Sequence, residues 1–389
     1  MLNPFSSSKH RTVAIIDIGT SSAGVAIMSL ESGKPCTIEA SHRIFLAASS
    51  DQKDSVAAVV SLVKEAGSRV KALLEKKSPN VHHVPHAVYI FARAPWSRSA
   101  THKLVEHFPD DKKLTSADLD ANSKKILSAI DGIDTKKLLE ASLTRVEING
   151  YPTAHPIGKH GHILGATVLA SDVDAAFKSA LTETAIALFP KTKPEWRTHT
   201  RAVLTLLREH TQDFRDALVA DIGSGGSDFI CVKDGVIAQQ MTMPDGANAI
   251  LSRVAKNGMP EETLSLLRMF ERDQCSNDAC NALKEGLSHA EGELVKVFGD
   301  ALGKMAATGR VPTKMVLFAI PDMAPWLSHF FSRIDFSQFT ITAQPFSPTI
   351  VSAANLSDWV TAGTGLSVDV SLLLACTLVH IEHASAKLR

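Results

Sequence analysis

The sequence TVAIIDIGTS occupies residues 12–21, and a related sequence, DFRDALVADIGSGGSD, occupies residues 213–228. Each stretch is an apolar run that reaches Asp-Ile-Gly and continues into small residues. The residues that follow also match, because each stretch leads into a second apolar run, a short turn and a third run. The pattern strand, loop, strand, turn, strand therefore occurs twice, with Asp17 and Asp221 in equivalent places. This repetition predicts an internal duplication, that is, two similar α/β domains that face each other.

The bulk composition narrows the class of protein. A chain of 389 residues is long enough for two or more domains with their own cores. Its hydrophobic fraction of 44% and charged fraction of 21% are those of a soluble globular protein. Lys and Arg together number 41, as do Asp and Glu, so no net field attracts nucleic acid or anionic lipid. We expect no nucleic-acid partner.

The cysteines and the ends of the chain favour the cytoplasm. No two cysteines form a CxxC pair, which indicates reduced, buried thiols at all five (Cys36, Cys231, Cys275, Cys280 and Cys376). The first eleven residues, MLNPFSSSKHR, are neither basic enough nor apolar enough for a secretory signal. The longest late apolar run, residues 370–379, is too short to span a bilayer.

Helical periodicity separates the strands. Apolar spacing predicts helices at residues 55–76 and 260–270, and a longer helical stretch at residues 278–305 that glycines interrupt. Ser171 and Asp174 have the spacing of a capping box before the next helix, and TKMVLFAI at residues 313–320 is typical of a central strand. The expected division is a first domain at 1–94 that resumes at 171–212, a small α/β inserted subdomain at 95–170, a second domain at 213–246 with a helical subdomain at 247–312, and the end of the second domain with a return helix at 313–389.

The two Asp-Ile-Gly loops carry the groups that a polyphosphate needs. A carboxylate at a strand end can hold hydrated Mg²⁺, glycines let backbone N–H groups approach phosphate oxygens closely, and small hydroxyls donate hydrogen bonds. Two such loops on facing domains would hold one nucleotide between them. The candidate nucleotide-binding residues are Asp17, Gly19, Thr20, Ser21, Asp221, Gly223, Ser224, Gly225, Gly226, Ser227 and Gly246, with Asp17 and Asp221 binding Mg²⁺ through water.

These loops resemble those of the actin-like ATPases, and most closely the FtsA/PilM branch of that superfamily. VADIGSGGSDFICVKDGVI at residues 219–237 resembles the second phosphate motif of FtsA, and MPDGANAILSRVA follows it in the expected place. INGYPTAHPIGKHGHILGATV at residues 148–168 resembles the inserted subdomain of FtsA and PilM. The resemblance extends from about Arg11 to about His380, and the leader before the first strand looks more like that of PilM.

The resemblance implies a fold and a role. The fold is a duplicated actin-like (ribonuclease H-like) pair of α/β domains around a nucleotide cleft. The role is that of a scaffold that binds ATP and Mg²⁺ and links a cytoskeletal polymer or a pilus machine to inner-membrane partners. Its partners would be an FtsZ-like polymer tail or a PilN-like membrane-protein peptide, with self-polymerisation as a further property. FtsA ends in a lipid-binding helix, and the ending IEHASAKLR has no such helix, so contact with the membrane is expected through partners only.

Departures from the family pattern weaken the expected nucleotide site. No Lys stands at residues 22–24, shortly after the first Asp-Ile-Gly, and Ala319-Ile320-Pro321 stands where the family has the glycines that approach adenosine. We therefore expect weakened ATP binding and at most a weak ATPase. Glu209 and Gln212 are candidates for positioning the attacking water, and the sequence does not distinguish them from surface residues of a helix.

Two alternatives stay open. One is a nucleotide-free pseudo-ATPase that serves only as a scaffold. The other is a sugar or acyl-phosphate kinase of the same fold, which needs a catalytic acid in the cleft and usually a larger sugar-binding insertion. Within the adaptor hypothesis, the sequence does not separate a role in cell division from a role in type IV pilus assembly.

Overall fold

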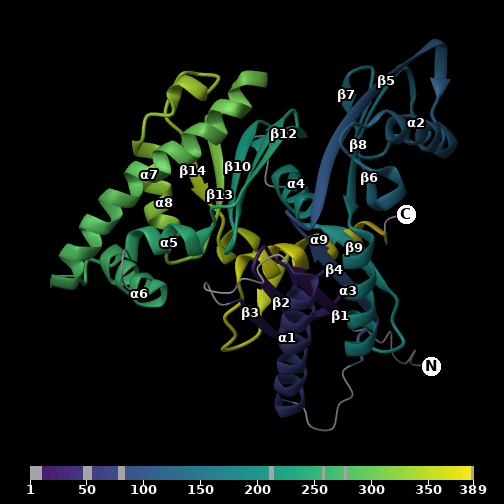
Figure 1. Ribbon diagram of the computed structural model, residues 1–389. Coiled ribbons are helices and arrows are strands. Elements are labelled where there is room, and N and C mark those ends of the chain that lie inside the picture. The colour runs from purple at the N-terminus through teal and green to yellow at the C-terminus, as the bar shows by residue number, and fades with distance from the viewer. Residues whose placement is uncertain are drawn as a thin grey trace.

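The computed structural model describes residues 11–46, 55–77, 84–209, 214–255, 259–275 and 278–386. Within these residues the strands form three sheets, and helices cover their faces (Figure 1). Two of the sheets are related by the predicted duplication, and the third belongs to the segment inserted into the first domain.

The first-domain sheet has the strand order β15-β3-β2-β1-β4-β9. Its strands are β1 (Arg11–Ile18), β2 (Ser22–Leu30), β3 (Cys36–Phe45), β4 (Ala87–Ala92), β9 (Pro194–Thr198) and β15 (Val360–Ala362). Strands β1, β2 and β3 are antiparallel neighbours, whereas β4 and β9 run parallel to β1. Apolar residues occupy both faces of β1 because helices cover both sides of the sheet.

The second-domain sheet repeats this plan in the order β12-β11-β10-β13-β14. Its strands are β10 (Ala217–Ile222), β11 (Ser227–Lys233), β12 (Val236–Met243), β13 (Lys314–Phe318) and β14 (Ser347–Ile350). Again the first three strands are antiparallel and the next two are parallel to the first. Asp234 and Gly235 both have positive φ, which suits the tight turn between β11 and β12. The predicted duplication is confirmed.

The helices form layers around these two sheets. Helices α1 (Val56–Lys77) and α3 (Ala175–Leu188) cover the outer face of the first sheet. Helices α4 (His199–Glu209) and α9 (Val370–Ala386) share one apolar core with both sheets and lie between them (Figure 1). The outer face of the second sheet is covered by helices of the second domain, α5 (Ala247–Ala255), α6 (Pro260–Glu271), α7 (Asp278–Thr308) and α8 (Ala324–Arg333).

The inserted subdomain lies between β4 and α3 in the chain. Its sheet has the order β5-β8-β6-β7, from β5 (Ser97–Lys113), β6 (Leu138–Ile148), β7 (Tyr151–Pro152) and β8 (His160–Val173). Helix α2 (Ser116–Ala129) packs on one face of this sheet, and the subdomain projects beside β12 of the second domain (Figure 1). The Thr101 hydroxyl donates a hydrogen bond to the carbonyl of Ile237, 2.9 Å away, so the insertion contacts both domains.

Four local expectations were wrong. The cap of α3 is Asp174, whose carboxylate accepts from two backbone N–H groups, while Ser171 lies inside β8. Helix α7 is continuous through its glycines. One of them, Gly286, allows close packing against α5, because a Cβ there would lie 2.3 Å from the carbonyl oxygen of Val254. Residues 360–362 form β15 rather than a loop. Cys275 and Cys280 form a disulfide, since their Cα atoms lie 5.6 Å apart, a distance that a disulfide can bridge.

The other three cysteines are free and buried, as expected (Cys36, Cys231 and Cys376). In the part of the chain that the structure describes, no helix combines the length and the apolar character needed to cross a membrane.

Candidate functional site

The two predicted aspartates lie at equivalent places in the cleft between the domains. Asp17 is the last residue but one of β1, and Asp221 is the last residue but one of β10. Both are almost fully buried, with exposures of 0% and 6%. Arg93, which follows β4, lies between them. Its Nη1 is 2.9 Å from Oδ2 of Asp221, and its Nη2 is 3.7 Å from Oδ2 of Asp17.

A second arginine pairs with Asp17 from within the first domain. Arg43 on β3 donates to Oδ2 of Asp17 over 2.5 Å and to the Ser22 hydroxyl over 3.0 Å. Its Nε lies 3.0 Å from a carboxylate oxygen of Asp369, just before α9. The Arg43 side chain is itself buried, so Asp17 has a permanent cationic partner inside its own domain.

A histidine completes the contacts of Asp221. His199 begins α4, and its Nδ1 lies 3.0 Å from Nη2 of Arg93, while its Nε2 lies 3.3 Å from Oδ2 of Asp221. Arg93 and His199 thus contact Asp221 from the first-domain side of the cleft.

These contacts shift the pKa values of the buried carboxyls. Burial by itself would raise the pKa of Asp17, but the charges of Arg43 and Arg93 hold that pKa below its ordinary value. Burial would also raise the pKa of Asp221, but Arg93 and His199 outweigh it and lower that pKa to about 2. Asp228 on β11 differs, because burial, with a smaller contribution from Asp221, raises its pKa to about 6. The cleft therefore contains two carboxylates that are strongly stabilised in the charged form and one that is not.

The two predicted phosphate loops touch each other. The N–H of Gly225 donates to the Thr20 hydroxyl over 2.9 Å. A Cβ on Gly225 would lie 2.0 Å from Oγ of Ser21, and one on Gly223 would lie 3.0 Å from Oγ1 of Thr20. The glycines of the second loop thus allow the first loop to approach closely, rather than a ligand.

The remaining candidate residues are bound within their own domains. The carbonyls of Gly223 and Ser224 accept from the first N–H groups of α5 over 2.8 and 2.9 Å. Ser227 donates to the carbonyl of Asp245 over 2.6 Å, and a Cβ on Gly246 would lie 2.3 Å from the nitrogen of Gly226. In the first loop, the N–H of Gly19 donates to the carbonyl of Ser22 over 2.8 Å.

In this arrangement the cleft does not fit Mg-ATP. The cavity that the two loops and Arg93 enclose has a volume of about 10 Å³, which is about what a single water needs. Oδ1 of Asp17 is buried without a hydrogen-bond partner among the described residues, and Asp17 does not line this cavity. The structure brings the predicted residues together, but their partners are arginines, a histidine and one another. Binding of ATP by these residues stays a prediction.

Three residues of this cluster were not predicted from the sequence (Arg43, Arg93 and His199). Of the candidates for positioning a water, Glu209 is the last residue of α4, about 15 Å along the helix from His199 at a rise of 1.5 Å per residue, and it pairs with Arg208. Gln212 lies outside the described residues. Ala319 and Ile320 pack against the core of the second domain.

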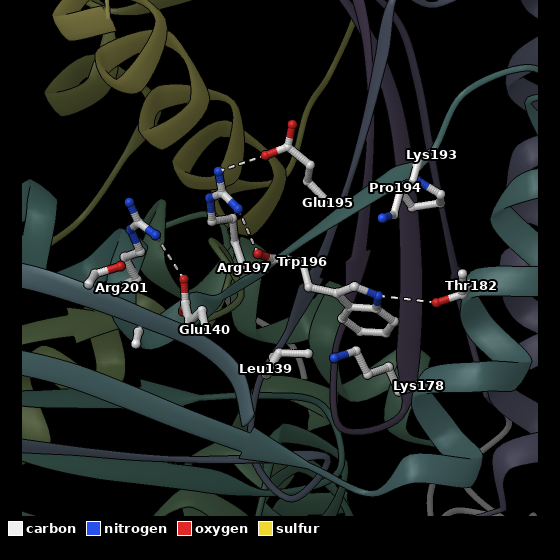
Figure 2. A pocket seen from close by; sticks show the side chains of 12 residues that line it. Leu139, Glu140, Lys178, Thr182, Lys193, Pro194, Glu195, Trp196, Arg197 and Arg201 are labelled. Atoms are coloured by element: carbon white, nitrogen blue, oxygen red, sulfur yellow. Dashed lines mark hydrogen bonds and ion pairs between the residues drawn. The ribbon is translucent and has the colours of Figure 1, made fainter. Parts of the chain in front are cut away.

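A second candidate site is an open groove between the inserted subdomain and the first domain (Figure 2). Its volume is about 660 Å³. The residues that line it come from β6, α3, β9 and α4 (Leu139, Glu140, Ala141, Ser142, Lys178, Thr182, Lys193, Pro194, Glu195, Trp196, Arg197 and Arg201). Among the described strands β9 pairs only with β4, and β7 pairs with β6 only at Glu147 and Ile148. Two strand edges without a ladder partner therefore border the groove.

Ion pairs and hydrogen bonds fix the walls of the groove (Figure 2). Glu140 on β6 accepts from the N–H of Thr198 over 2.8 Å and from Arg201 over 3.0 Å, which ties the inserted subdomain to the first domain. Trp196 donates from Nε1 to the Thr182 hydroxyl over 3.2 Å. The groove is thus a rigid surface with an aromatic residue in its wall.

Comparison with known proteins supports the fold. No protein-family model matches the sequence, and no curated protein sequence does either. The structure of a PilM–PilN type IV pilus biogenesis complex matches with a TM-score of 0.57 at 12% identity, over 96% of this chain and 99% of that chain. The chain has the actin-like ATPase fold. The predicted resemblance to PilM is thus confirmed for the fold.

Other structures match with lower TM-scores. The ethanolamine utilization protein EutJ from Carboxydothermus hydrogenoformans matches at 0.46 and 11% identity, over 97% of this chain and 92% of that chain. A Bacteroides thetaiotaomicron protein described as having the actin-like ATPase fold matches at 0.35 and 8% identity, over 97% of this chain and 99% of that chain.

Proposed function

We propose that this protein is an assembly adaptor that holds an extended peptide of a partner protein in the groove between β6 and β9. The observation that carries the proposal is the groove itself, where two strand edges face a volume of about 660 Å³. This volume lies within the usual range of about 300–1,000 Å³ for ligand sites. An added strand could form main-chain hydrogen bonds with either edge, which is a common mode of peptide recognition.

The lining of the groove favours a particular kind of peptide. Leu139, which is partly exposed, supplies apolar contact area, whereas Trp196 is buried in the wall. Lys178 and Lys193 lie on the same side of the groove (Figure 2). Lys193 is exposed. The glutamates that border the groove, Glu195 and Glu140, form ion pairs with Arg197 and Arg201 rather than with these lysines. We therefore propose a segment with one large apolar side chain and at least one carboxylate.

The partner we favour is the short cytoplasmic segment of a membrane protein. The structural neighbour PilM was solved together with PilN, and this favours a role in pilus assembly over one in cell division. In this proposal the protein lies at the cytoplasmic face of the inner membrane and reaches it through that partner. Attachment to a polymer tail and self-polymerisation are the competing forms of the same adaptor role.

The proposal is tested with synthetic peptides that cover the cytoplasmic segments of membrane proteins encoded beside this chain. Fluorescence anisotropy should detect saturable binding to one of them. Leu139→Glu removes apolar contact, and Lys193→Glu reverses a charge in the lining of the groove, so both should weaken binding. Lys124→Glu on the exposed face of α2 serves as the matched control. Binding that neither groove variant changes would remove the groove from the proposal.

The role of nucleotide is a separate part of the adaptor hypothesis. In the form that the sequence suggests, Mg-ATP bound by Asp17 and Asp221 sets the closure of the domains and so the affinity for partners. In the other form, the protein is a scaffold that needs no nucleotide. The arginines between the aspartates and the small cleft volume favour the second form. No described feature favours a kinase.

A further inference from the structure

We infer that Arg93 is a built-in latch, which holds the two domains closed at the place where the sequence predicts Mg-ATP. In this inference a guanidinium of the chain itself supplies the cation between Asp17 and Asp221, and closure requires no nucleotide. The inference does not depend on the peptide groove, because it concerns a different part of the molecule.

The distribution of charge on the first-domain side supports the latch. Arg43 pairs with Asp17 at 2.5 Å and with Asp369 at 3.0 Å, so Asp17 already has a cationic partner within its own domain. Arg93 lies 3.7 Å from Asp17 but 2.9 Å from Asp221. Its shorter contact is thus with the second domain, although its side chain is only 7% exposed.

On the second-domain side, Asp221 depends on the first domain for its partners. Within the described residues, the ion pairs of Asp221 are formed with Arg93 and His199, and both come from the first domain. Both oxygens of Asp221 accept from Nη1 of Arg93, over 2.9 and 3.2 Å. When the domains separate, each charge loses its partner and must be hydrated instead. Charge-assisted hydrogen bonds are among the stronger ones, and these form only while the cleft is closed, so they favour the closed state.

The backbone around Arg93 holds the side chain in place. The N–H groups of Trp96 and Ser97 donate to the carbonyl of Arg93 over 2.9 and 3.2 Å. Trp96 donates from Nε1 to the carbonyl of Gly19 over 2.9 Å and stacks on Phe177 with 4.8 Å between the ring centroids. The segment that carries the latch is thus fixed to the first phosphate loop and to α3, and only its guanidinium crosses to the second domain.

A latch of this kind has a direct consequence for ligands. Mg²⁺ and a triphosphate could enter only by displacing Arg93 from Asp221 and separating Thr20 from Gly225. A ligand that binds the native state raises the melting temperature, so the wild-type protein should show no rise with millimolar Mg-ATP. Without nucleotide it should already have the compact radius of gyration of the closed form.

The experiment compares the full-length wild type with two variants by thermal melting and small-angle X-ray scattering. Arg93→Met should lower the melting temperature by several degrees and increase the radius of gyration. Arg93→Met combined with Asp221→Asn should recover part of both losses, because it removes the unpaired carboxylate as well. Arg69→Met is the matched control, since Arg69 pairs with Glu65 on α1 and the two side chains are 59% and 49% exposed, and it should keep the wild-type radius.

Three results would overturn the latch. One is a wild-type radius that decreases on addition of Mg-ATP, since closure would then need the nucleotide. Another is a Mg-ATP-dependent rise in the melting temperature of the wild type that Asp221→Asn abolishes. The third is Arg93→Met with wild-type stability and radius. If Arg93→Met does not fold, the two wild-type measurements with Mg-ATP still decide the question, and peptide binding in the groove is measured independently.

Discussion

The interdomain cleft and the groove beside the inserted subdomain are both lined by charged residues, but the charges do different things. In the cleft, the carboxylates and guanidiniums are buried and paired with one another, and a volume of only about 10 Å³ remains. In the groove, Lys193 is exposed, two of the described strand edges lack a ladder partner, and the volume is about 660 Å³. In our proposals, the duplicated loops that carry the motif hold the two domains together. The groove beside the insertion is the surface proposed to bind a partner.

The strongest test of the closed cleft is removal of Arg43. In Arg43→Met, Asp17 stays 0% exposed and loses the guanidinium 2.5 Å away. Breaking a buried pair in this way costs roughly 3–5 kcal/mol, which urea denaturation at neutral pH should detect. Arg69→Met provides the control, because Arg69 forms an exposed pair with Glu65 that is worth about 1 kcal/mol or less. Equal losses in both variants would mean that the buried cluster is not special.

The contact between the two loops can be broken with a single methyl group. In Gly225→Ala the new Cβ would lie 2.0 Å from Oγ of Ser21, and such overpacking typically costs about 1–3 kcal/mol. Adding Ser21→Gly should restore most of the lost stability. Gly292→Ala in α7 is the control, since its Cβ would meet open space. This change should stabilise the helix by about 0.5–1 kcal/mol. A neutral Gly225→Ala would show that the loops are apart in solution.

Asp228 offers a test by pH. Its pKa is raised from 3.8 to about 6, so the native state binds this proton more tightly than the unfolded state does. Its contribution to stability is therefore largest below about pH 4, and it is lost as the pH rises through 6. Asp228→Asn keeps an acceptor for the Thr242 hydroxyl, which is 2.5 Å away, and removes the cost of the buried charge. We expect it to stabilise the protein at pH 7.5 by about 1–3 kcal/mol.

The measurement for Asp228→Asn is thermal melting of the wild type and the variant between about pH 4.5 and about pH 7.5. This range extends to both sides of the pKa of about 6. The difference between the two proteins should shrink as the pH falls, because the wild-type carboxyl becomes protonated and neutral. A difference that is constant across this range would assign the effect to packing rather than to charge.

The sequence could predict features that depend on neighbouring residues in the chain, but not contacts between residues far apart in it. The β1–β2–β3 and β10–β11–β12 units follow from local alternation of buried strands and turns, and both were predicted. The cleft contacts were not, because Arg43 is separated from Asp17 by 26 residues and Arg93 from Asp221 by 128. An arginine near the end of a strand gives no local sign of the carboxylate it will face.

The same reason explains smaller errors. Strand β15 has only three residues and forms because β3 offers it an edge about 320 residues earlier in the chain, which no local pattern shows. The groove has no local sequence pattern either. Its position depends on Glu140 of β6 binding to Thr198 at the end of β9, and that contact exists only after the insertion has folded onto the first domain.

The smallest expected effect on stability comes from the groove, and for that reason it separates binding from folding. Lys193 lines the groove and is exposed, so Lys193→Glu should change the free energy of unfolding by no more than about 0.5 kcal/mol. The same change replaces attraction by repulsion for a peptide carboxylate in the groove. A loss of about 1.4 kcal/mol in binding would correspond to a tenfold weaker affinity, measured by anisotropy with the peptide that binds the wild type. Because surface charges are screened by salt, this difference should decrease as the salt concentration is raised.

Lys124→Glu carries the same change of charge on α2, away from the residues that line the groove, and should bind like the wild type. If both variants lose affinity equally, the peptide responds to the overall charge of the protein, and the groove between β6 and β9 is not its site.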